Sequence, residues 1–237
     1  TYLAGDIIYH NYKFQRDFGK YINIWGADHH GYISRVKAAI SWLGHDSSKL
    51  EVLLSQMVAL LKDGEPYKMS KRAGNYVLMS DVVEEIGIDA LRFIFLTKKS
   101  DSHIEFDVSS LKNNDSSNPV FYINYAHARV NQLFAKANLT IDEVLNAPID
   151  NIGENGINLA FEAMLLLWSL EDAFAKREMQ KIVDFLLELS GMIHRLYGES
   201  KVLGDQNQNA FLKVFAISAM SLRVGLRVLG INAKDVM

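Results

Sequence analysis

The spacing of apolar residues changes after Asn118-Pro119, and this change constrains the fold more than any other feature of the sequence. Asn118 suits a helix N-cap and Pro119 suits the first helical position, so we expect a helix from here to about Asn138. Three further stretches keep apolar residues at helical spacing, over residues 157–174, 179–197 and 210–229. These long amphipathic helices in succession predict an α-helical bundle around one core.

The first half of the sequence carries a different pattern, in which short β-rich runs alternate with helical spacing. Residues 21–25 read as a strand, 26–31 as a loop, 32–43 as a helix and 50–58 as a second buried strand. A turn signal at residues 63–66 ends that second strand. This order predicts half of a parallel α/β sheet, in which ligands bind beyond the carboxyl ends of the strands.

Two short helices are expected between the sheet and the bundle. Asp81 is expected to cap the first helix, which ends near Gly87. Asp89 is expected to cap the second helix, over residues 90–97.

The polar segment 98–118 separates the two patterns, and its NNDSSN tail is the best boundary candidate. We therefore predict an α/β domain over residues 1–113 and an α-helical domain over residues 114–237. The chain has a net charge of −3, and its negative excess lies in the helical part. Contact between that part and a nucleic acid would therefore depend on local cations and aromatic stacking.

Composition excludes several classes of protein. The sequence contains no cysteine, so a disulfide framework and a thiolate metal site are both excluded. Its apolar runs are shorter than the roughly 20 residues of a membrane-spanning helix. Residues 1–10 also lack the basic start and apolar centre of a signal peptide. We expect a cytoplasmic protein that does not contact membranes and is a monomer.

The segment EPYKMSKRAGN, residues 65–75, places three cations on a loop between a proline and a glycine. Lysines on such loops are usually only solvated. Mobile ammonium groups can also neutralise the charge that grows on a departing pyrophosphate. The string KMSK, residues 68–71, therefore remains open to either interpretation until its context is considered.

The segment IWGADHHGY, residues 24–32, follows the first predicted strand. It can be an ordinary turn, in which the glycines permit tight backbone and Asp28 caps the next helix. A rival interpretation takes Asp28, His29 and His30 as metal ligands, as in the DHH phosphoesterases. That chemistry needs further carboxylates, and the sequence has no Asp-rich partner motif.

Tyr122, Tyr125 and Arg129 fall on one face of the first predicted bundle helix. Such a face is commonly a half-buried packing stripe, and it can also stack unpaired bases. His127 has no evident partner, and we expect it to be a helix histidine satisfied within the fold.

The motifs resemble those of the arginyl-tRNA synthetase family, within the class I aminoacyl-tRNA synthetases. The resemblance runs from Tyr2 to Met237 and depends on strings in the family's order: YLAGD at 2–6, GADHHGY, KMSK, DALR at 89–92 and FYINYAHAR at 121–129. It implies the second half of a Rossmann-type catalytic domain followed by a DALR anticodon-binding domain. It also implies ATP-dependent attachment of arginine to tRNA(Arg) through arginyl-adenylate, with Mg²⁺ accompanying ATP and no metal site in the protein.

The resemblance also implies residues that contact the small substrates. Catalysis is implied for Lys68 and Lys71. The ATP site is implied to include Gly26, Asp28, His29, Lys68, Met69, Ser70 and Lys71. Arginine is implied to meet Tyr2, Asp6 and His30. A carboxylate suits this substrate because it accepts a planar guanidinium through two parallel hydrogen bonds.

For the tRNA anticodon, the residues that the resemblance implies are Tyr122, Tyr125, Arg129, Tyr197 and Met237. Lys201 stands where some members have an aromatic residue, which departs from the pattern. Arg92 of the DALR string is expected to be a structural cation.

The HIGH-type motif, with which class I enzymes hold ATP from the other side, does not occur in this sequence. We therefore expect the 237-residue chain to activate no arginine by itself. A free-standing RNA-binding module is the alternative, and it would bind an anticodon stem-loop and be indifferent to ATP.

Overall fold

The computed structural model describes residues 2–66, 78–112, 115 and 117–237, and its contacts divide the chain into two compact units. The first unit comprises Thr1–Ala59 with Ser100–Glu105, and the second comprises Leu60–Lys99 with Phe106–Met237. This division follows contacts between residues, so the predicted domain boundary between residues 113 and 114 stays a prediction.

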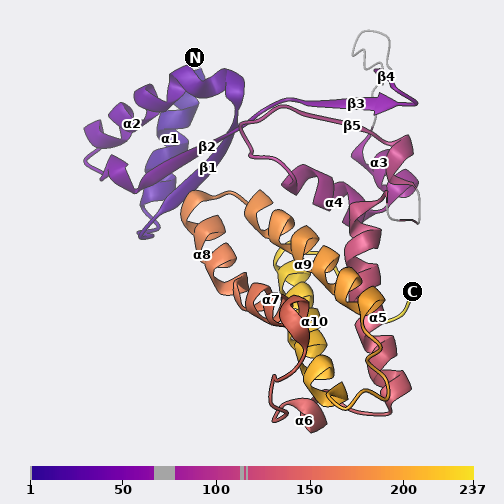
Figure 1. The fold of residues 1–237 in the computed structure, drawn as a ribbon. Coiled ribbons are helices and arrows are strands. Elements are labelled where there is room, and N and C mark those ends of the chain that lie inside the picture. The colour runs from indigo at the N-terminus through magenta and orange to yellow at the C-terminus, as the bar shows by residue number, and fades with distance from the viewer. Residues whose placement is uncertain (1, 67–77, 113–114, 116) are drawn as a thin grey trace. The chain divides into compact units, whose positions relative to one another are not determined.

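A two-stranded parallel sheet forms the centre of the first unit (Figure 1). Its strands are β1 (Tyr21–Gly26) and β2 (Leu50–Ser55), in a register that runs from Tyr21 opposite Leu50 to Gly26 opposite Ser55. The crossover contains the 3-10 helix η1 (Ala27–Tyr32), α2 (Ile33–Trp42) and the 3-10 helix η2 (Ser47–Lys49). Parallel strands need such a crossover, and the predicted half of an α/β sheet is confirmed.

The helix α1 (Tyr2–Phe14) packs against α2 and was not anticipated from the sequence. Its C-terminal residue Phe14 stacks on Tyr21 of β1, with ring centroids 4.2 Å apart. The buried core of this unit consists of Phe14, Tyr21, Val36, Ile40 and Leu50.

The predicted single strand over residues 50–58 is wrong, because the chain leaves the parallel sheet after Ser55. The backbone N–H of Gln56 donates to the carbonyl of Ser100 at 2.7 Å, instead of continuing the pairing with β1. A separate strand starts at Val58.

That separate strand belongs to a second sheet with the order β4-β3-β5, where β3 is Val58–Lys62, β4 is Glu65–Pro66 and β5 is Ile104–Asp107. The division between the units passes through β3 and β5. The predicted turn is confirmed at Asp63-Gly64, where both residues have positive φ. The Asp107 carboxylate accepts the backbone N–H of Gly64 at 2.6 Å and closes this turn.

Helices form the rest of the second unit. They are α3 (Met79–Ile86), α4 (Ile88–Leu96), the 3-10 helix η3 (Ser109–Leu111), α5 (Pro119–Ala137), α6 (Ile141–Val144), α7 (Gly153–Met164), α8 (Leu166–Lys176), α9 (Gln180–Glu199) and α10 (Gln208–Val228). Figure 1 shows α5, α9 and α10 side by side, and their apolar faces share one core. Within the described ranges, no helix is both long and apolar enough to cross a membrane.

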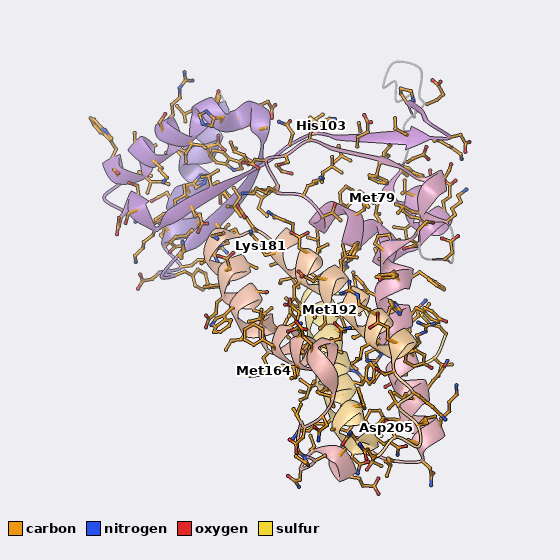
Figure 2. The ribbon with its side chains drawn as sticks, viewed as in Figure 1. Met79, His103, Met164, Lys181, Met192 and Asp205 are labelled. Atoms are coloured by element: carbon orange, nitrogen blue, oxygen red, sulfur yellow. The ribbon has the colours of Figure 1, made fainter. Side chains whose placement is uncertain are left out.

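The single helix predicted over residues 157–174 is two helices. Met164, labelled in Figure 2, ends α7, and Leu165 separates it from α8. The N–H of Leu165 bonds to the carbonyl of Glu162 three residues back, which interrupts the α-helical ladder. Apolar spacing continues through the break, so the sequence pattern does not reveal it.

The predicted caps have mixed outcomes. The Asn118 side chain accepts the N–H groups of Val120 and Phe121, which confirms the N-cap of α5. The caps assigned to Asp81 and Asp89 are wrong, because α3 starts after Leu78 and α4 starts after Gly87. Both aspartates instead lie in a first turn, where a negative charge favours the helix dipole.

Candidate functional site

A cleft of about 580 Å³ opens at the carboxyl end of β1 in the first unit. It is lined by Asp6, Ile24, Trp25, Gly26, Asp28, His29 and Tyr32. Because β1 and β2 run parallel, this is the edge at which α/β sheets bind ligands. The cleft therefore brings a carboxylate of α1, a carboxylate of η1 and aromatic walls to one place.

Gly26 permits the close approach of backbone and carboxylate at the floor of this cleft. A Cβ atom on Gly26 would lie 2.6 Å from Asp28 Oδ1. Asp28 follows on η1, and its Oδ2 lies 3.7 Å from His29 Nε2. The side chain of Asp28 is 81% exposed, so it is free to contact a polar ligand that enters the cleft.

The predicted small-substrate residues are only partly brought together. Asp6, Gly26, Asp28 and His29 line the cleft. His30 is exposed on η1 and does not line it, and α1 begins at Tyr2. The predicted loop residues Lys68, Met69, Ser70 and Lys71 lie outside the described residues.

Sequence reasoning did not single out Trp25 and Tyr32, which form aromatic walls of the cleft. Both flank the GADHHG string, so their position around the motif was an available signal. Among the described residues, those of the cleft included, no group of three or more histidine, aspartate or glutamate side chains is placed to hold a metal ion.

A second candidate site lies in the second unit, on the face shared by α5 and α9. The guanidinium of Arg129 lies over the Tyr125 ring at 4.5 Å and over the Tyr197 ring at 4.8 Å from the centroids. These contacts tie the predicted residues of α5 to the predicted tyrosine of α9. The result is a half-buried surface of π faces around one fixed cation.

His194 of α9 joins this surface and was not predicted as a site residue. Its ring lies 4.6 Å from the Tyr122 ring and 5.6 Å from the Tyr125 ring. Its Nε2 donates to the carbonyl of Tyr122 at 3.1 Å, and its Nδ1 accepts from Arg129 at 3.2 Å. The spacing of His194 three residues before Tyr197 was a signal that the two share a helix face.

His127 lies on another face of α5, and its ring, like that of His194, bonds to a backbone carbonyl through one nitrogen and to an arginine through the other. It is 1% exposed, and its Nδ1 donates to the carbonyl of Lys234 at 2.9 Å. Its Nε2 accepts from Arg223 at 3.3 Å, and Arg223 also bonds to Asp235. The expectation that His127 is satisfied within the fold is confirmed.

Segment 230–235 is held by these contacts along α5 and α4. Lys234 N–H donates to Asn124 Oδ1 at 2.8 Å, and Arg92 donates to the carbonyl of Gly230 at 2.9 Å. Arg92 is therefore a structural cation, as predicted. Met237, which follows this segment, is 37% exposed.

Unfolding of the second unit is expected to become easier as pH falls below the ordinary histidine pKa of 6.5. Burial lowers the pKa of both His127 and His194, and the positive charges of Arg223 and Arg129 add to this effect. The hydrogen bonds to Lys234 and Tyr122, and for His127 the charge of Asp235, act in the opposite direction. A lowered pKa means that the unfolded chain binds more protons, so stability is retained above pH 6.5 and lost below it.

The measurement is the urea unfolding free energy of the chain between pH 8 and pH 5, an interval chosen to bracket about 6.5, the ordinary histidine pKa. His194→Gln should reduce the dependence on pH, whereas His103→Gln, at an exposed position, should leave it as it is. If the unfolding free energy changes with pH by the same amount in the parent and in His194→Gln, the contribution given to His194 is wrong.

Models of two protein families match the chain. The family described as the DALR anticodon binding domain matches residues 123–237. The family described as tRNA synthetases class I (I, L, M and V) matches residues 12–107. These matches confirm the predicted fold class, part of a class I catalytic domain followed by a helical DALR domain.

Curated relatives match over the whole chain. The arginine–tRNA ligase of Aliarcobacter butzleri (strain RM4018) is 63% identical over 237 residues, which is 100% of this chain and 45% of that protein. The arginine–tRNA ligase of Campylobacter curvus (strain 525.92) is 61% identical over 235 residues, which is 99% of this chain and 44% of that protein. The chain thus spans less than half the length of these relatives.

Solved structures of arginyl-tRNA synthetases also align with this chain. A crystal structure from Campylobacter jejuni, assigned as an arginyl-tRNA synthetase, aligns with a TM-score of 0.94 at 57% identity and covers 100% of this chain and 52% of that chain. The arginyl-tRNA synthetase of Thermus thermophilus aligns with a TM-score of 0.72 at 18% identity, over 92% of this chain and 41% of that chain. The second match shows a shared fold.

Proposed function

Because this chain belongs to the arginyl-tRNA synthetase family, we propose that it provides part of the adenylate-forming site and the anticodon-binding surface of an arginine–tRNA ligase. In the first reaction, the arginine carboxylate attacks the α-phosphorus of ATP, arginyl-adenylate forms and pyrophosphate leaves. In the second, a terminal ribose hydroxyl of tRNA(Arg) takes the arginyl group and AMP leaves. A cytoplasmic location is part of this proposal.

The cleft of the first unit would bind the small substrates. Asp6 would accept the arginine guanidinium, and Asp28 would accept the ribose hydroxyls of ATP. The absence of a side chain at Gly26 leaves the Asp28 carboxylate in its place, since a Cβ there would lie 2.6 Å from Asp28 Oδ1. Tyr2 and His30 are proposed to complete arginine recognition, and His29, on the cleft wall, to contact ATP.

The KMSK loop would act on the phosphates. Lys68 and Lys71 would neutralise the charge that develops on pyrophosphate, with Met69 and Ser70 shaping the loop. Mg²⁺ would enter with ATP and supply further positive charge to the phosphates. The alternatives of an RNA-binding module and a metal phosphoesterase are not favoured, because the matched relatives are arginine–tRNA ligases.

The observation that carries the tRNA half of the proposal is the position of Arg129 between two tyrosine rings. Tyr122, Tyr125 and Tyr197 would stack unpaired anticodon bases, and Arg129 would add charge and hold the rings apart. Met237 is proposed to border the same bases. Only unpaired bases can offer their faces to these rings, so the surface fits a single-stranded loop better than a duplex.

Arg129→Lys tests the tRNA half of the proposal. Lysine keeps the charge but has no planar guanidinium to lie on two rings, so the dissociation constant for tRNA(Arg) should rise about tenfold. Arg16→Lys is the matched control, since Arg16 lies over the Tyr12 ring in the first unit. Equal tRNA affinity in the two variants would count against the anticodon surface.

Gly26→Ala, made in the intact ligase that contains this chain, tests the nucleotide half of the proposal. The new Cβ should displace the Asp28 side chain, so the ATP KM in arginine-dependent pyrophosphate exchange should rise about tenfold. Gly31→Ala is the control in the same motif, because a Cβ there meets no atom within 4 Å. If both variants keep the parental ATP KM, the role given to Asp28 is wrong.

A further inference from the structure

A chain of hydrogen bonds lies behind the cleft and joins α1 to β1. Its central members are buried, with His10 2% exposed and Asn23 7% exposed. Asn23 Nδ2 donates to His10 Nε2 at 2.7 Å, and His10 Nδ1 donates to the carbonyl of Asp6 at 2.7 Å. At the other end, Lys13 donates to Asn23 Oδ1. The side chains of His10, Lys13 and Asn23 have no role in the proposed reaction.

The two ends of this chain fix the direction of its bonds, because the ammonium group of Lys13 can only donate and the carbonyl of Asp6 can only accept. Asn23 must therefore turn its carbonyl oxygen to Lys13 and its NH₂ group to His10. His10 Nε2 must then accept, which leaves its proton on Nδ1 for the carbonyl of Asp6. A flipped amide or the other imidazole tautomer would set two donors against each other.

The chain touches both sides of the cleft. Asp6, whose carbonyl ends the chain, lines the cleft from α1. Trp25, two residues after Asn23 on β1, lines it from the sheet, and its ring meets the His10 ring edge-on at 6.3 Å. A shift of His10 would therefore move both the helix that carries Asp6 and the aromatic wall beside it.

We propose that Lys13, Asn23 and His10 form a positioning device that sets α1 against β1 and so aims the Asp6 carboxylate at the arginine guanidinium. This inference rests on the proposed function, in which Asp6 selects arginine. Two parallel hydrogen bonds require both oxygens of the carboxylate in one plane with the guanidinium. A small displacement of α1 loses that alignment, whereas Asp28 is carried by η1 and not by α1.

The test is Asn23→Leu in the intact ligase that contains this chain. Leucine has nearly the same size and removes the bonds to both His10 and Lys13. The arginine KM should rise about tenfold or more while the ATP KM stays unchanged. In ¹⁵N spectra of the ring, His10 Nε2 should lose the signature of a hydrogen-bonded acceptor, while Nδ1 keeps its proton for the carbonyl of Asp6.

Asn11→Leu is the matched control, because Asn11 also lies on α1 and accepts a hydrogen bond from a histidine, His45 Nε2, at 2.9 Å. That bond ends at His45, between α2 and η2, whereas His10 contacts Asp6 and Trp25, which both line the cleft, so neither KM should change in this control. If Asn23→Leu does not fold, Lys13→Met removes the bond to Asn23 Oδ1 and should raise the arginine KM in the same direction.

An unchanged arginine KM in a folded variant of Asn23 or Lys13, against an active parent, would overturn this inference alone. Absence of arginine-dependent exchange in the parent ligase would overturn the proposed function and the inference together. A rise in both KM values would also contradict it, since a general loss of structure does not distinguish arginine from ATP.

Discussion

Replacing Asp6 with asparagine is expected to raise the arginine KM of the ligase roughly a hundredfold and to leave the ATP KM nearly unchanged. Asparagine keeps the size but has no charge and only one acceptor oxygen, so the guanidinium loses one of two parallel bonds. A hydrogen bond to a charged group contributes about 1.5–3 kcal/mol, and about 1.4 kcal/mol corresponds to a tenfold change. Arginine-dependent pyrophosphate exchange measures both constants.

Asp28→Asn is the control for this prediction, since both aspartates line one cleft. It should raise the ATP KM and leave the arginine KM close to the parental value. The division of roles between the two carboxylates fails if both variants raise the same constant.

Replacing Phe215 with alanine should lower the unfolding free energy of the second unit by about 3–5 kcal/mol. Phe215 is fully buried in α10, so its removal leaves a cavity that the neighbouring helices cannot close. The Tyr197 ring meets Phe215 edge-on at 6.4 Å, so the same change should also weaken tRNA binding. Urea unfolding followed by circular dichroism measures the first effect.

Phe161→Ala is the matched control, because the same substitution on α7 removes a ring that is 61% exposed. Its effect on the unfolding free energy should stay within about 0.5 kcal/mol. Similar losses in the two phenylalanine variants would show that burial in the helical core does not account for the effect.

Local patterns in the sequence predicted the elements that carry both candidate sites. The strand β1, the helix α2 and the Asn118 cap follow from apolar spacing and capping chemistry within a few residues. The aromatic face of α5 was also predictable, because three- and four-residue spacing on one helix fixes which side chains are neighbours.

Features that depend on distant contacts could not be predicted in this way. His194 bonds to the Tyr122 carbonyl 72 positions away, and no local pattern reports that pairing. The strand break at Gln56 likewise depends on its bond to Ser100. The break at Leu165 is hidden because apolar residues continue on both sides of it.

The hydrogen bonds of segment 230–235 determine when one face of α5 becomes covered during synthesis of the protein. Its bonds join Lys234 to His127 and to Asn124, which are 107 and 110 positions earlier in the chain. During translation, α5 therefore leaves the ribosome long before residues 230–235 have been made. This face of α5 remains exposed to solvent in that interval. A nascent chain stopped before residue 230 would leave the His127 ring and the Asn124 amide without these partners, so this face of α5 is completed only by the last residues to be translated.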